Sequence, residues 1–192
     1  MAARPSSLET DAPARSPYHG RRMTLAAFEA LPEQRPYLQW WDGVVVQKAV
    51  SRIPHGIVQL YLAAVLDQYT RAMNAHAATE VHIWFEGHGY LVPDLVYWAP
   101  GRPLAEGDRA LPPSLAIEIR SPRESAASQR EKCRRMRANG VAVCWLIDPA
   151  ARSAECFDAT RDGERAGPRL EAAAFPGLAI DLEPLWARLP SS

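Results

Sequence analysis

The order of apolar and polar residues along the chain predicts helices that alternate with short strands. From residue 55 to about residue 73, apolar side chains recur at three- and four-residue spacings, which is the period of an amphipathic helix. A second helix is expected over 126–139, where Cys133 and Met136 define the apolar face. A shorter helix is expected over 23–31, near the amino-terminal end.

Turn signals between β-prone runs predict two hairpins. The dipeptide Asp42-Gly43 separates two such runs within residues 37–50 and is a strong hairpin signal. Residues 79–99 predict a second hairpin, because apolar and polar side chains alternate there on both sides of a turn at 86–89. A loop rich in proline and glycine follows.

Two parallel strands joined by the second helix are expected to form the centre of the sheet. The run 142–148 is almost wholly apolar, as in a strand buried on both faces, and the helix before it is long enough for a crossover from a strand at 115–120. A further strand is expected over 153–158, then a turn near Asp162, and a strand leading into a short helix over 175–186. The predicted fold class is α/β (α+β), a mixed sheet flanked by helices, with an amino-terminal helix and hairpin.

Length and composition predict one domain. A chain of 192 residues can bury a sizeable core, which we place in residues 23–190. Residues 1–22 are rich in Pro, Ala and Ser and lack the apolar segment of a secretory signal, so a disordered tail is expected. No apolar run approaches the roughly 18 residues of a membrane span. Three cysteines without zinc-site or disulfide spacing indicate a cytoplasmic protein with reduced thiols.

The charge balance excludes a strongly basic nucleic-acid-binding domain. The chain has 22 Lys and Arg residues and 22 Asp and Glu residues, so no global positive field attracts a polyanion. Any nucleic-acid site must be a local patch. The helix over 126–139 offers one, because Arg130, Arg134 and Arg137 point away from its apolar face and are expected to contact DNA phosphates.

Two acids and a lysine on neighbouring elements predict a metal-dependent hydrolytic site. A carboxylate such as Glu118, which alternates with apolar residues in 115–120, is costly to bury unless it is paired or metal-bound. Mg²⁺ needs only one or two protein carboxylates, and Asp94 and Glu118 are the candidate ligands, with the Ile119 carbonyl as a third. Lys132 is the candidate for orienting the attacking water or stabilising negative charge. Such a site would hydrolyse a phosphodiester.

Each of these residues also has a structural interpretation. Glu118 shares a strand face with Arg120, and the two side chains are long enough to form an ion pair, although Arg120 is equally a candidate phosphate ligand. Lys132 is at the boundary of the helix's apolar face, where a solvated lysine is common. Asp94 follows a proline and is also a typical turn residue. His55 begins the long helix, where it would satisfy backbone groups or join the site.

These residues fall in an ordered set of motifs: PD at 93–94, LAIEIRSP at 115–122, EK at 131–132 and NGVAVCWLIDP at 139–149. In this set the chain resembles the Uma-two family of restriction endonucleases, a branch of the PD-(D/E)xK nuclease superfamily. The segments MTLAAFEALP, WDGVVV and FPGLAIDLEPLW are also similar, so the resemblance covers about residues 23–189. Each motif alone is short and weak. The order is far more specific, with 24 positions from Asp94 to Glu118 and 14 more to Lys132.

The resemblance implies a restriction-endonuclease-like core, Mg²⁺ at the two acids with Mn²⁺ as an alternative, and DNA as the substrate. Superfamily nucleases usually have the lysine two residues after the acid, where this chain has Arg120, whereas the family has one in the next helix, where Lys132 falls. Many members have an acid before the first hairpin turn. This chain has Gln39 there, and its amide brings no charge to a cation.

The sequence therefore predicts a Mg²⁺-dependent endonuclease that hydrolyses DNA, with Gln39, His55 and Arg120 as accessory site residues. A homodimer would supply two sites for the two strands. The departures at Gln39 and Arg120 support an alternative, a catalytically inactive nuclease-fold module for nucleic-acid binding or assembly. A nuclease acting on RNA or on branched DNA is a third possibility.

Overall fold

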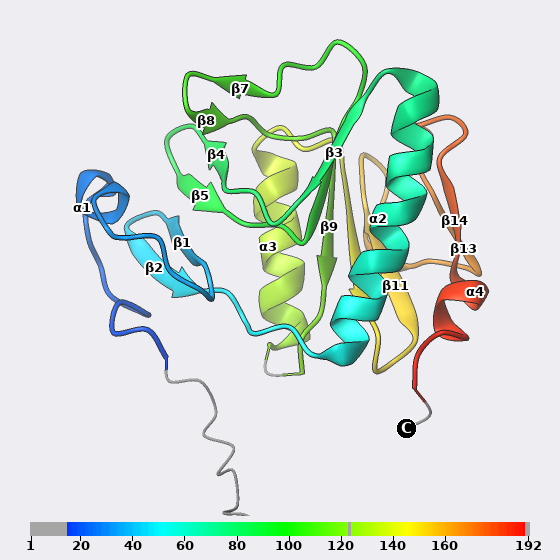
Figure 1. Cartoon of the computed structure of the whole chain (residues 1–192), viewed down its shortest axis with the longest axis horizontal. Helices are drawn as coiled ribbons and strands as arrows, with labels where there is room; N and C mark the ends of the chain where they lie inside the picture. Colours follow the sequence, from blue (N-terminus) through cyan, green and yellow to red (C-terminus); the bar gives the residue numbers. More distant parts are fainter. Residues whose placement is uncertain (1–14, 123, 191–192) are drawn as a thin grey trace, which may run out of the picture.

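A computed structural model describes residues 15–122 and 124–190 (Figure 1). Residues 1–14, which make up most of the tail predicted from the sequence, lie outside the described residues. Within the described ranges, no helix combines the length and the apolar character needed to cross a membrane.

The segment 15–22 runs beside strand β2 (Val44–Gln47), although the sequence prediction placed it in the tail. The Gly20 N–H donates to the Val45 carbonyl oxygen at 2.8 Å, and Arg22 forms an antiparallel bridge with Val44. Since β2 is the end strand of its sheet, these contacts cover an edge that would otherwise offer unpaired backbone groups.

The central sheet has six strands in the order β12-β11-β10-β9-β6-β3. Their bounds are β3 His76–Thr79, β6 Leu95–Trp98, β9 Leu115–Ile119, β10 Val143–Asp148, β11 Ser153–Phe157 and β12 Asp162–Arg165. Strands β9 and β10 are parallel and are joined through helix α3 (Ala126–Ala138), while the neighbouring pairs are antiparallel. The predicted crossover and mixed sheet are therefore confirmed.

Helices α2 (Ile53–Met73) and α3 cover opposite faces of the central sheet (Figure 1). One core joins Leu62 of α2 to Ile117 of β9, and the other joins Cys133 of α3 to Ala116 of β9. The alternation predicted for this strand is confirmed. Fully burying a Leu or Ile side chain contributes roughly 1.5–3 kcal/mol, so packing from both sides fixes the strand that carries Glu118.

A second six-stranded sheet shares the core on the α3 side, in the order β2-β1-β5-β4-β8-β7. Its other bounds are β1 Leu38–Trp41, β4 Ile83–Phe85, β5 Gly89–Leu91, β7 Ala105–Glu106 and β8 Arg109–Ala110, with helix α1 (Leu25–Glu29) before β1. Both predicted hairpins are confirmed. Residues 79–99 hold more than a hairpin, however, because the chain leaves β5 after Leu91, passes Pro93, which has no N–H for the ladder, and enters the central sheet as β6.

The carboxyl-terminal part adds β13 (Arg169–Glu171), β14 (Ala179–Asp181) and helix α4 (Leu182–Trp186), which confirms the predicted strand and short helix. The turn predicted near Asp162 is wrong, because Asp162 begins β12. The turn lies earlier, where the Asp158 carboxylate accepts the N–H groups of residues 160 and 161.

Candidate active site

Strand pairing brings Asp94 and Glu118 to the same end of the central sheet. Strands β6 and β9 are antiparallel, with Leu95 opposite Ile117. Continuing this register by one residue sets Asp94, just before β6, across from Glu118. Directly opposed residues have Cβ atoms about 4.5–5.5 Å apart. Asp94 and Glu118, which are 24 positions apart in the sequence, are therefore neighbours on adjacent strands.

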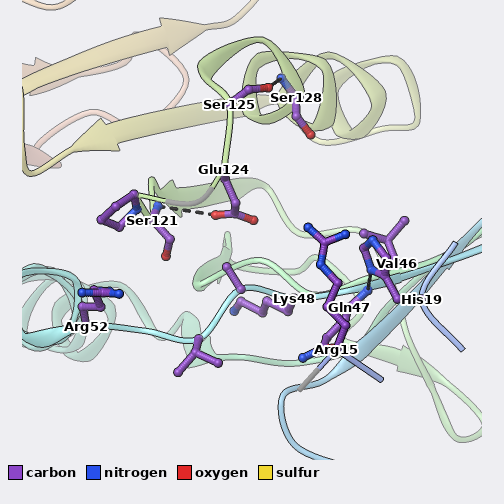
Figure 2. A pocket seen from close by; sticks show the side chains of 13 residues that line it. Arg15, His19, Val46, Gln47, Lys48, Arg52, Ser121, Glu124, Ser125 and Ser128 are labelled. Atoms are coloured by element: carbon purple, nitrogen blue, oxygen red, sulfur yellow. Dashed lines mark hydrogen bonds between the residues drawn. The ribbon is translucent and has the colours of Figure 1, made fainter. Parts of the chain in front are cut away.

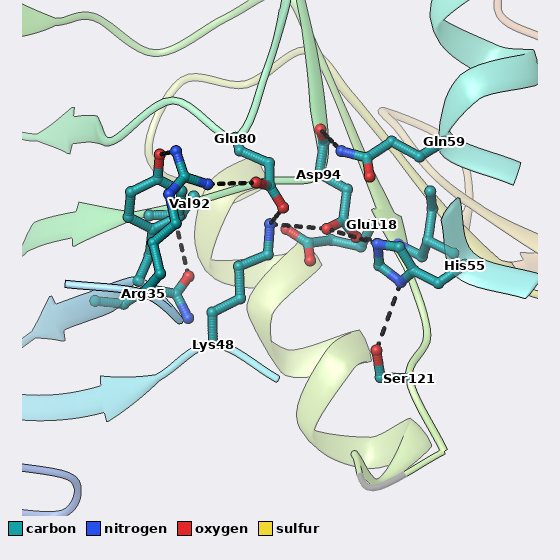
Figure 3. Close-up of polar contacts among 12 residues, drawn as sticks. Arg35, Lys48, His55, Gln59, Glu80, Val92, Asp94, Glu118 and Ser121 are labelled. Carbon is teal, nitrogen blue, oxygen red and sulfur yellow. Dashed lines mark hydrogen bonds and ion pairs between the residues drawn. The ribbon is translucent and has the colours of Figure 1, made fainter. Parts of the chain in front are cut away.

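Asp94 is only 1% exposed, and three groups surround its carboxylate (Figure 3). The Ile119 N–H donates to Oδ2 at 2.6 Å, while Lys48 Nζ and His55 Nε2 lie 2.8 Å and 3.3 Å from Oδ1. Burial alone would raise the pKa of Asp94, but the contact with His55 and the positive charge of Lys48 outweigh burial and hold the pKa well below its ordinary value. Asp94 is therefore ionised at neutral pH.

Glu118 is the second buried acid, 2% exposed, and Lys132 Nζ lies 2.8 Å from its Oε1. Burial raises its pKa most strongly, the positive charge of Lys132 opposes this, and the negative charge of Asp94 adds to it, so the pKa rises to about 7. Neighbouring carboxylates whose pKa values are pushed apart are typical of sites that bind cations or transfer protons.

Gln39 and Lys132 hold Val92, two residues before Asp94. The Val92 N–H donates to Gln39 Oε1 at 2.8 Å, and Lys132 Nζ donates to the Val92 carbonyl oxygen at 3.0 Å. The Gln39 amide oxygen, expected from the sequence as an accessory group of the site, is thus engaged with backbone. Gln39 therefore helps to fix the connection between β5 and β6, which carries Asp94.

The two acids offer oxygens that fit a divalent cation. Asp94 Oδ1 and Glu118 Oε1 are buried and accept no hydrogen bond of good geometry from described residues, although a lysine ammonium lies close to each. Within residues 15–122 and 124–190, no three His, Cys, Asp or Glu side chains are grouped for metal binding. Two carboxylates are enough for a hard divalent cation that keeps several waters in its shell.

Lys48, His55 and Ser121 separate the acids from two clefts. Lys48 and Ser121 line a first cleft of about 640 Å³ (Figure 2), and His55 and Ser121 line a second of about 450 Å³. Both Lys48 and His55 contact Asp94, and Ser121 Oγ lies 3.5 Å from His55 Nδ1. A cation or phosphate arriving from either cleft therefore meets these side chains before the carboxylates.

Arg120 does not form the ion pair with Glu118 that was one interpretation of the sequence. Its guanidinium pairs with Asp148 and donates to the Glu124 carbonyl oxygen at 3.3 Å. That interpretation is wrong because Lys132, from the helix above, takes the position beside Glu118. Arg120 lines the second cleft.

The three arginines of α3 that were expected to contact DNA are engaged within the protein. Their partners are Glu155 for Arg130, at 2.6 and 2.7 Å, Asp162 for Arg134, at 2.8 Å, and the Val141 carbonyl oxygen for Arg137, at 2.6 Å. Contact with a phosphate would compete with these bonds. Their role in nucleic-acid binding stays a prediction.

Sequence reasoning missed Lys48, Glu80 and Ser121. Lys48 Nζ bridges Asp94 and Glu80, 3.3 Å from Glu80 Oε1, and only 9% of its side chain is exposed. Burial would lower the pKa of Lys48, but the negative charges of Asp94, Glu118 and Glu80 together raise it. The one available signal was a lysine at the end of a β-prone run, where a solvated lysine is the usual interpretation.

The raised pKa of Glu118 predicts a pH-dependent stability of the metal-free protein. Its pKa is about 7 in the fold against an ordinary 4.5, so over that window the folded chain holds a proton that the unfolded chain has lost. Glu118 therefore subtracts stability progressively as pH rises from 4.5 to about 7, and no further above it. In EDTA, the melting temperature of Glu118→Gln should rise by a few degrees relative to that of wild type as pH increases from 4.5 to about 7. A pH-independent difference between the two proteins would contradict the raised pKa.

Comparison with known proteins matches the region of the chain that contains these residues. Residues 25–183 match the Uma2 family, described as "Putative restriction endonuclease". The fold is similar to the crystal structure of "a putative nuclease belonging to DUF820" from Anabaena variabilis ATCC 29413, with a TM-score of 0.76, 23% identity, and coverage of 86% of this chain and 98% of that one. At that identity the likeness establishes the fold. No curated protein matches the sequence.

Proposed function

Because the chain belongs to the Uma2 family of restriction-endonuclease-type proteins, we propose that it is a Mg²⁺-dependent endonuclease that hydrolyses DNA phosphodiester bonds. The supporting observation is the pair of buried carboxylates, each with an oxygen that accepts no hydrogen bond of good geometry from described residues and lies 2.8 Å from a lysine ammonium. Asp94 and Glu118 would hold the ion, with the Ile119 carbonyl as a further ligand, and Mn²⁺ also suits oxygen donors. When bound, the ion would offset charge on the phosphate and lower the pKa of a water.

The protein side chains would position the substrate and the water. Lys132, held by Glu118 and by the Val92 carbonyl oxygen, presents its ammonium at the acids and would orient the attacking water. His55 contacts Asp94 and would keep its carboxylate in place. Arg120 lines the second cleft, where its planar guanidinium suits a phosphate oxygen.

A cleavage assay tests the proposed activity. The purified protein should nick or cut plasmid DNA in Mg²⁺ or Mn²⁺, and EDTA or Asp94→Ala should stop the reaction, because both remove the bound cation. Duplex RNA, single strands and branched DNA belong in the same panel, since the site geometry favours none of them. Cleavage that continues in EDTA would contradict a metal-dependent mechanism.

An inactive binding module is the second candidate. It is favoured by the two lysine ammoniums, which already pair with the acids, and by Gln39, whose amide is engaged with Val92. Binding of nucleic acid without cleavage of any substrate in either metal would support this candidate. A homodimer stays a prediction, and sedimentation in the presence of DNA would measure it.

A further inference from the structure

The first cleft has more positive than negative side chains in its lining. Its charged lining consists of Arg15, Lys48, Arg52 and the single acid Glu124, and His19 lies among them (Figure 2). Burial raises the pKa of Glu124. The chain as a whole carries no net charge, so this excess is local.

The second cleft meets the first along Arg52, Ser121 and Pro122, which line both. It adds Arg120 and Arg152, with Asp148 as its acid, and that acid is paired with Arg120. Arg52 and Arg152 form no ion pair with the described residues. They are therefore available to a ligand without breaking a bond, unlike the arginines of α3.

Two helix starts reinforce the positive potential. Helix α2 begins after Arg52 with no side-chain cap, and helix α3 begins after its capping residue Ser125, which lines the first cleft. Neither helix has an acidic residue in its first turn, so the partial positive charge of each helix start is not offset by its own side chains.

His55 lies between the second cleft and Asp94. Its side chain is 4% exposed and lines the second cleft, and its Nε2 has no hydrogen-bond partner among described residues beyond the 3.3 Å contact with Asp94. A phosphate at the junction of the clefts would sit beside this ring and beside Arg52.

We infer that the two clefts form one continuous track for a nucleic-acid strand, in which Arg52 binds the phosphate nearest the acids and Arg152 binds a phosphate farther along. This inference rests on the proposed function, and it assigns the substrate to the face between the starts of α2 and α3 instead of the outer face of α3. Each arginine would neutralise one phosphate and release its counterions, so binding through the track weakens with salt.

Binding measured without metal separates this inference from catalysis. Fluorescence anisotropy of a labelled oligonucleotide in EDTA should show about tenfold weaker binding for the double variant Arg52→Gln/Arg152→Gln, and the slope of log Kd against log salt should fall by about 0.7–0.9 for each lost phosphate contact. Arg134→Gln removes a paired arginine on α3 and tests the surface predicted from the sequence. Arg169→Gln, which removes an arginine on β13 that is paired with Asp181, is the matched control and should bind like wild type. Circular dichroism confirms that the variants are folded.

The track would be overturned if the double variant bound with wild-type affinity and salt slope. It would also be overturned if Arg134→Gln were the only variant with weaker binding. The second result would restore the α3 surface predicted from the sequence. If the wild-type protein cleaves DNA while the double variant binds normally, the track fails and the nuclease stands. If binding depends on the two arginines but no metal supports cleavage, the track stands and the nuclease fails.

Discussion

Replacing Glu118 with glutamine should lower the rate of DNA cleavage about a thousandfold or more while leaving the protein folded. The ion is expected to supply several kcal/mol of stabilisation to the charge on the reacting phosphate, and about 4 kcal/mol corresponds to a factor of about a thousand in rate. Glutamine keeps the shape of the side chain but removes the charge. Lys132 retains its bond to the Val92 carbonyl oxygen, so the helix contact survives.

Two measurements distinguish loss of the metal from loss of structure. Calorimetric titration with Mn²⁺ should show weaker binding to Glu118→Gln, and melting temperature should not fall. Glu155→Gln is the matched control, because Glu155 is an acid paired with Arg130 away from the site. Cleavage by Glu118→Gln at the wild-type rate would rule out a metal-ligand role for Glu118.

Replacing Lys48 with methionine should strengthen metal binding and weaken cleavage. The Lys48 ammonium lies 2.8 Å from the Asp94 oxygen that a cation would take, so it competes with the ion and repels it. At an effective dielectric of about 20, two unit charges 4 Å apart interact by about 4 kcal/mol, and a gain of about tenfold in Mn²⁺ affinity needs about 1.4 kcal/mol. The same ammonium lines the first cleft, where on the proposed function its loss would remove a charge available to a substrate phosphate.

The opposite signs of these two effects make the test specific. Lys48→Arg keeps the charge and should leave the metal affinity near the wild-type value, while Lys48→Met should raise it. Calorimetry reports the affinity independently of turnover. Weaker Mn²⁺ binding in Lys48→Met would mean that Lys48 helps to assemble the acids instead of occupying the place of the ion.

Turn signals and hydrophobic periods correctly predicted the helices and strands that are determined by residues close together in the sequence. The Asp42-Gly43 hairpin, helices α2 and α3, and the parallel pair β9 and β10 are all present, because turn chemistry and hydrophobic period act within a few residues. The order of Asp94, Glu118 and Lys132 also predicted which side chains meet. The structure places Lys132 against Glu118 and sets Asp94 across the ladder from it.

The remaining features depend on contacts between distant segments. Strand β3 is four residues long and mostly exposed, and it exists because β6 pairs with it. Lys48 joins the site because its ammonium meets Asp94 and Glu80, which lie 46 and 32 positions further along the chain. Glu80 has a left-handed backbone, with φ of 54°, and its N–H donates to the Asp94 carbonyl oxygen at 3.2 Å. No local pattern encodes these partners.

The pairing of β6 with β9 also determines where the chain tolerates insertions. Residues 99–114 lie between β6 and β9 and leave the central sheet. The register of β6 against β9, which aligns the two acids, therefore does not depend on how many residues this connection contains. Lengthening that excursion would leave both carboxylates in place. Deleting one residue inside β9 would instead rotate Glu118 toward the α2 core and present an apolar side chain to the cation.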